Sequence, residues 1–156
     1  MTRHNPPFQR AFTGAPWEAK VGYCRALRCG PHVWVTGTVA VDENGAVYAP
    51  GDAGAQTRRA LEIIERALAQ VDAEMSDVVR TRMFVTDITR WQEIGRAHGE
   101  FFAAHPPTTT MVEVSGLIDP AYLVEIEADA FIASAAAGAG AVDDATRASP
   151  GPPTTP

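Results

Sequence analysis

The sequence predicts one α+β domain, a mixed β-sheet with two helices on one face. Three observations lead to this fold class. The chain has 156 residues, of which 46% are hydrophobic and 21% are charged, which fits one soluble core. Strand-like and helix-like segments follow one another in the order β-β-β-α-β-α-β-β. Helices inserted between strands act as crossovers, and crossovers of this kind pack on one face of a sheet.

Three strand-like segments precede the first helix. Residues 23–28 and 32–38 (HVWVTGT) are predicted to be strands on either side of a Cys-Gly-Pro turn at 29–31. Residues 39–48 contain the turn sequence Asp-Glu-Asn-Gly, which predicts a hairpin leading into a short strand at 46–48. Residues 1–16 have prolines and no period, so they predict a flexible lead-in before a domain at 17–133.

The two predicted helices have apolar residues at helical spacing. The first runs from an Asp52 cap to about residue 73, with Leu61, Ile64 and Leu68 on its buried side. The second runs from a Thr89 cap to about residue 105 and is stopped by two prolines.

Three strands complete the predicted sheet, at residues 78–86, 108–117 and 123–132. The face away from the helices then needs cover, and we expect Met83, Val85 and Met111 to lie on it, under another subunit. The Ala/Gly/Pro-rich tail at 134–156 has almost no large apolar residue and predicts disorder.

Composition argues against several classes of function. The net charge is −6 and no basic stripe is present, so nucleic-acid binding is not expected. The two cysteines and four histidines match no metal or disulfide motif, so we expect no metal and no cofactor. No apolar leader or membrane-length run is evident, which predicts a cytoplasmic protein without membrane contact.

Five short motifs occur in a characteristic order along the chain. They are VTG at 35–37, VVRTRMFVTD at 78–87, EFF at 100–102, PPTTTMVEV at 106–114 and VEIEADA at 124–130. Together they resemble the Rid family, the YjgF-type reactive-intermediate deaminases, over residues 21–131. The resemblance implies a fold like that of trimeric α+β chorismate mutase, with homotrimers that bind small molecules in clefts between subunits.

The resemblance also implies which residues line the cleft. The family's strand tyrosine corresponds to Tyr23, and its Ser-Gly pair corresponds to Thr36 and Gly37. Its glutamate, which orients the hydrolytic water, corresponds to Glu125. The residues themselves leave a second interpretation of Glu125 open, as part of a solvated acidic strand face. We expect Gly37 to permit close approach of a ligand or a neighbouring subunit.

Two positions depart from the family's pattern. Gly95 replaces a helix asparagine, and Thr109 replaces the arginine that clamps the substrate carboxylate. Threonine has one hydroxyl and no charge, whereas arginine offers a bidentate fork. Another cation would have to replace it, and Arg25 is the first candidate because it shares a strand face with Tyr23. Arg28, Arg80 and Arg82 are the other candidates.

Three functions follow from these residues. The first is hydrolysis of a small imine or enamine, with Glu125 as the catalytic group and Tyr23, Arg25, Thr36, Gly37 and Thr109 contacting the substrate. The second is a non-catalytic trimer that binds a small ligand. The third is an endoribonuclease, against which the acidic composition argues.

Overall fold

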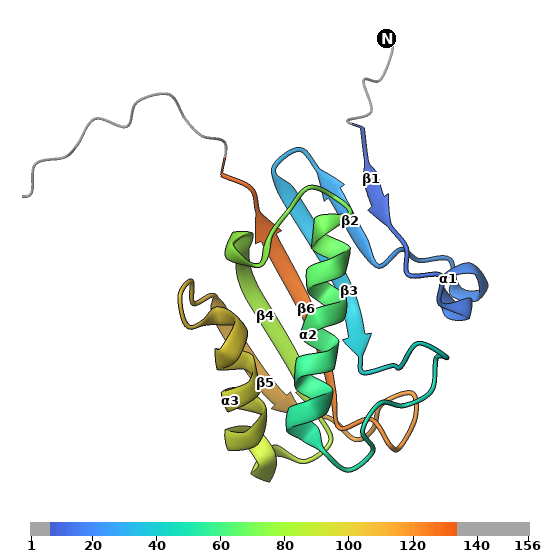
Figure 1. The fold of residues 1–156 in the computed structure, drawn as a ribbon, viewed down its shortest axis with the longest axis vertical. Coiled ribbons are helices and arrows are strands. Elements are labelled where there is room, and N and C mark those ends of the chain that lie inside the picture. The colour runs from blue at the N-terminus through green and yellow to red at the C-terminus, as the bar shows by residue number, and fades with distance from the viewer. Residues whose placement is uncertain (1–6, 134–156) are drawn as a thin grey trace, which may run out of the picture.

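A six-stranded mixed sheet forms the centre of the structure, a computed structural model that describes residues 7–133 (Figure 1). The strand order is β1-β2-β3-β6-β4-β5. Only β4 and β5 pair in parallel, and the other neighbours are antiparallel. The predicted α+β class and chorismate-mutase-like arrangement are therefore confirmed. The strands are β1 (Gln9–Ala11), β2 (Ala26–Cys29), β3 (His32–Val39), β4 (Val78–Val85), β5 (Thr108–Glu113) and β6 (Val124–Phe131).

The two long helices, α2 (Ala53–Ala69) and α3 (Trp91–Phe102), cover one face of the sheet (Figure 1). Asp52 caps α2, and its carboxylate accepts a hydrogen bond from the Ala55 backbone N–H at 2.7 Å. The core between helices and sheet is made mostly of Leu, Ile, Val and Ala side chains. Its largest fully buried apolar members include Leu61, Ile64, Leu68, Ile94 and Ile126.

Both helices are shorter than predicted, because a left-handed residue follows the first helix and a 3-10 turn precedes the second. After α2, Asp72 takes a left-handed conformation with φ of 55°, which ends the helical run before residue 73. Before α3, a 3-10 turn spans Ile88–Arg90, and the carboxylate of Asp87 caps that turn by accepting from the Thr89 backbone N–H at 2.9 Å.

The N-terminal part of the sheet differs from the prediction. Strand β1 lies in the segment expected to be a flexible lead-in, and its Ala11 is fully buried against β2. The short helix α1 (Pro16–Val21) follows it beside β2 and β3 (Figure 1). The strand predicted at 46–48 makes only one bridge, between Val41 and Val47, and is not part of the sheet. The predicted tail at 134–156 lies outside the described residues.

The sheet face opposite the helices is uncovered in the single chain. Met83 and Val85, which we expected on this open face, are instead buried under the helices, and Met111 packs against the same core. The open face exposes Trp34 and Phe131, at 46% and 43% respectively. A large exposed apolar surface on a small protein usually marks an interface.

No helix within residues 7–133 is both long and apolar enough to span a membrane.

Candidate functional site

The residues predicted to line the cleft form two separate groups in one chain. The first, called here the Glu125 cluster, consists of Tyr23, Arg25, Thr36, Gly37 and Glu125, where β2, β3 and β6 meet. The second group contains Thr109 and lies on β5, an edge strand of the sheet.

Glu125 extends from the open face of β6 and lies against the backbone of β3. The pairing of β3 with β6 shifts between Val35 and Thr38, which places Thr36 and Gly37 in a bulge. A Cβ atom added to Gly37 would overlap Oε1 of Glu125 and lie 3.0 Å from its Cδ. The close approach that we expected at Gly37 is therefore made by the Glu125 carboxyl group of the same chain.

Burial raises the pKa of the half-buried Glu125 carboxyl above its usual value. The neighbouring Glu127 carboxylate raises this pKa further, and Arg25 opposes both effects. A carboxyl group whose pKa moves toward neutrality is better suited to accept a proton from water than an ordinary surface glutamate.

Arg25 is only 8% exposed, and its guanidinium is committed to groups of the same chain. Nη1 donates to the Gly37 carbonyl oxygen at 2.9 Å and to Thr38 Oγ1 at 3.2 Å. Nη2 donates to the Tyr23 hydroxyl oxygen at 3.2 Å, and Nε lies 3.8 Å from Oε1 of Glu18. Arg25 is thus brought into the cluster as predicted, but as a buried internal partner rather than as an open cationic clamp.

The other candidate cations are also largely occupied. Arg82 pairs with Glu127 at 3.0 Å and with Asp129 at 2.9 Å on the open face. Arg28 donates to the Val71 carbonyl oxygen at 2.8 Å. Arg80 is exposed and forms no ion pair with any residue in the described range.

Thr109 takes part in a short chain of hydrogen bonds on the helix side of the sheet. Thr81 Oγ1 lies 2.9 Å from Thr109 Oγ1 and 2.9 Å from Nε2 of His98 on α3. Thr81 is fully buried, and burial lowers the pKa of His98, so the neutral imidazole is favoured. Gly95, one turn earlier on α3, has open space where a side chain would project.

Thr109 and Glu125 face opposite sides of the same sheet. Thr109 pairs with Thr81, which pairs with Ala128, a residue buried on the helix side. Glu125 alternates to the open side because successive residues of a strand point to opposite faces. One chain alone therefore does not bring these two predicted residues into one site.

Two residues of these groups were missed by sequence reasoning. In VVRTRMFV, Thr81 shares the period of two with Met83 and Val85, which groups the three on one face without showing that the helices cover it. Glu18 gave no comparable signal, since its burial depends on the folded turn at Thr13 and on the ion pair with Arg25.

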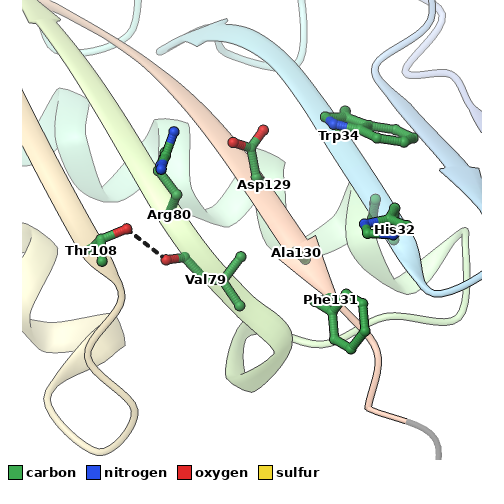
Figure 2. Close-up of a pocket in the computed structure, with 9 residues that line it drawn as sticks. His32, Trp34, Val79, Arg80, Thr108, Asp129, Ala130 and Phe131 are labelled. Carbon is green, nitrogen blue, oxygen red and sulfur yellow. Dashed lines mark hydrogen bonds between the residues drawn. The ribbon is translucent and has the colours of Figure 1, made fainter.

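A hollow on the open face has a volume of about 510 Å³ (Figure 2). An aromatic group lines one side of it. His32 stacks on Trp34 at 5.8 Å between ring centroids and meets Phe131 edge-on at 5.2 Å. Arg80 and Asp129 contribute charges near its centre. Arg80, one of the candidate cations, lines this hollow, but Tyr23, Arg25, Thr36, Gly37, Thr109 and Glu125 do not, so we separate it from the candidate site.

Among residues 7–133, no three His, Cys, Asp or Glu side chains converge in a way that would hold a metal ion.

Known proteins similar to this chain agree with the fold. The profile of the family described as Endoribonuclease L-PSP matches residues 13–132. A Mycobacterium tuberculosis protein, Rv2704 of the YjgF/YER057c/UK114 family, has a crystal structure with 48% identity and a TM-score of 0.74, covering 81% of this chain and all of that one. The 3-aminoacrylate deaminase RutC of Acinetobacter baylyi is 34% identical over 110 residues, which are 70% of this chain and 86% of RutC. An uncharacterized protein of Streptomyces coelicolor is 35% identical over 123 residues, 79% of this chain and 91% of that protein. With its profile match, its relatives and its sheet topology in agreement, this chain belongs to the Rid (YjgF-type) family, which is also described as Endoribonuclease L-PSP.

Proposed function

We propose that this protein hydrolyses a small imine or enamine in a cleft between subunits of a homotrimer. The observation that carries the proposal is Glu125, a half-buried carboxyl with a raised pKa that lies against Gly37. Family membership and the deaminase activity named for the relative RutC support the same reaction class.

The proposed reaction is hydrolysis of a C=N bond to a carbonyl compound and ammonia. Water adds to the imine carbon as Glu125 accepts one of its protons and passes it to the nitrogen, which gives a carbinolamine. The hydroxyl proton then moves to the nitrogen as the C–N bond breaks and the C=O bond forms, so ammonia leaves and no oxidant or reductant is needed. Tyr23 lines the cleft, while Thr36 and Thr109 donate or accept hydrogen bonds with the substrate.

A homotrimer offers a way to combine the two groups of residues. Thr109 lies on the edge strand β5, whereas the Glu125 cluster lies around the central strand β6 on the opposite face, so a complete cleft needs the second group from a neighbouring subunit. The exposed Trp34 and Phe131 on the open face favour association through that face. Sedimentation of the full chain should give three times the monomer mass, and a monomer at micromolar concentration would contradict this arrangement.

The residue at position 109 bears on substrate choice. A threonine hydroxyl cannot balance the charge of a buried carboxylate, and losing such a charged partner costs on the order of 2–5 kcal/mol. We therefore propose that the substrate group near Thr109 is uncharged. The alternative, that Arg25 replaces the missing arginine, is disfavoured by its enclosure between Glu18 and Gly37.

The test is release of ammonia and carbonyl product from a panel of imines generated in place by an amino-acid oxidase. The panel should contain 2-imino acids and the corresponding amides. Glu125→Gln keeps the side-chain shape and removes the proton acceptor, so its rate should drop toward the blank. The matched control is Glu65→Gln, which removes one carboxylate from the exposed side of α2. Its rate of imine hydrolysis should equal that of the unaltered protein. Equal imine decay with the unaltered protein and with Glu125→Ala would refute the proposal.

A second candidate function is a trimer that binds a small ligand without turnover. The internal hydrogen bonds of Thr109 and Arg25 favour it, because both polar groups already have partners without a substrate. A compound that raises the melting temperature but is recovered unchanged would support this candidate. Cleavage of RNA, which the family's description suggests, is tested by incubating the protein with single-stranded RNA at low salt. We expect intact RNA, because the chain carries a net charge of −6.

A further inference from the structure

A buried ion pair connects the N-terminal segment to the Glu125 cluster. Glu18 of α1 is only 5% exposed, although it carries a carboxylate. Its oxygens accept hydrogen bonds from the Thr13 backbone N–H at 3.0 Å, from Thr13 Oγ1 at 2.8 Å and from the Gly14 backbone N–H at 3.1 Å. Its remaining charged neighbour is Arg25, at 3.8 Å. A carboxylate this deeply buried is stable only when it is paired and hydrogen-bonded in this way.

Arg25 connects Glu18 to the residues around Glu125. Its Nη1 holds the carbonyl oxygen of Gly37, the residue against which the Glu125 carboxyl rests. Its Nη2 holds the hydroxyl of Tyr23. Moving Arg25 would therefore move both the backbone under Glu125 and the side chain of Tyr23.

We propose that Glu18 and Arg25 are positioning residues that fix the place and the charge environment of Glu125, and that neither of them contacts the substrate. The proposal rests on the proposed function in one respect, the assignment of Glu125 as the catalytic group. It gives a role to Glu18, a residue outside the cleft positions, and it replaces the expectation that Arg25 clamps a substrate carboxylate.

Glu18 and Arg25 carry opposite charges, so their effects on the pKa of Glu125 can be distinguished. Glu127 on the same strand is the acid that raises its pKa, and Arg25 is the cation that lowers it. Among its cross-strand neighbours, Phe84 of β4 and Val39 of β3 carry no charge, and Arg82 is paired with Glu127. Removing the positive charge of Arg25 should raise the pKa of Glu125, whereas removing the negative charge of Glu18 should lower it.

The test is a carbon-detected NMR titration of the Glu125 carboxyl in the full-length protein, with its signal assigned by its loss in Glu125→Gln. Arg25→Gln should move the midpoint up, and Glu18→Gln should move it down, each by about half a pH unit or more. Arg28→Gln is the matched control, since Arg28 is a nearby arginine on β2 that also lies beside an acid, Asp72, and it should leave the midpoint unchanged. If the pair were merely structural, both substitutions would break the same contact and shift the midpoint in the same direction. Shifts of the same sign, or no shift, would overturn the proposal.

A second variant covers the case in which Arg25→Gln fails to fold because Glu18 is left buried and unpaired. The double variant Glu18→Gln/Arg25→Gln removes both charges together, and its Glu125 midpoint should lie above that of Glu18→Gln alone. An equal or lower midpoint would contradict the role of Arg25.

Turnover gives an independent measure of the same roles. If imine hydrolysis is observed, Arg25→Lys should lower kcat at least 10-fold with KM little changed, since the substrate does not touch Arg25. A rise in KM for carboxylate substrates with kcat unchanged would identify a clamp and overturn the proposal. If no imine is hydrolysed, the proposed function fails while the NMR result still tests the positioning pair.

Discussion

Replacing Gly37 with alanine should displace the Glu125 carboxyl group while changing the stability of the fold very little. The added methyl would overlap Oε1 of Glu125 and lie 3.0 Å from Cδ and 3.4 Å from Cγ. These are atoms of a flexible side chain, so Glu125 can rotate away and no backbone need move. The carboxyl group would then be displaced by on the order of 1 Å, and misplacement of that size can reduce a rate about 100-fold.

The stability of Gly37→Ala should change little by comparison. A side chain forced from its preferred rotamer costs about 0.5–1.5 kcal/mol, so the melting temperature should fall by only a few degrees. The pKa of Glu125 should fall toward its usual value in this variant, because the displaced carboxyl regains contact with water. Both effects are measurable by calorimetry and by NMR titration whether or not the chain turns over an imine.

The controls for Gly37→Ala are a matched glycine and a double substitution. Gly99→Ala makes the same chemical change on α3, where nothing lies within 4 Å of the new carbon, and its activity should be unchanged. In a Glu125→Gln background, Gly37→Ala should add no further loss of rate, because its effect acts through Glu125. Full activity of Gly37→Ala, or additive losses in the double variant, would refute this explanation of the glycine.

Three further predictions concern Thr109, His98 and the open face. Thr109→Arg should raise activity toward 2-imino acids relative to uncharged imines, measured as the ratio of kcat/KM values; no gain would mean that Gly95 or the cleft shape also matters. Burial lowers the pKa of His98 in the folded protein. As the pH falls below 6.5, the imidazole is therefore protonated in the unfolded chain before it is protonated in the folded one, and the free energy of unfolding should decrease. Denaturant unfolding at several pH values should show that the free energy of unfolding decreases less with falling pH in His98→Gln. The same pH dependence in both proteins would exclude His98 as the source of the decrease. Trp34→Arg on the open face should yield smaller species in sedimentation while keeping the circular dichroism of the fold, whereas an unchanged mass would place the interface elsewhere.

Period-two alternation in the last of the predicted strands indicates which of its side chains share a face. It groups Glu125, Glu127, Asp129 and Phe131, and in the structure these four alternate with buried residues. The same rule applied to VVRTRMFV would have put Met83 and Thr81 in the core, but the sequence does not reveal which face the helices cover.

Other features depend on contacts that local sequence does not encode. Strand β1 has three residues and exists because it pairs with β2, so no period of its own identifies it. The enclosure of Arg25 depends on Glu18 and on the bulge at Gly37, which the fold brings together. The opposite facing of Thr109 and Glu125 follows from strand order, which motif spacing alone does not determine.

The central place of β6 in the sheet has a consequence for biosynthesis. Strands β3 and β4 do not pair with each other, and each pairs with β6, the last strand within residues 7–133. During translation, the first half of the sheet and the β4–β5 unit must wait until residue 131 has left the ribosome before they can be joined. The final closure is therefore a long-range event, which favours slow folding and leaves two incomplete sheet edges exposed in any nascent chain that stalls before Val124.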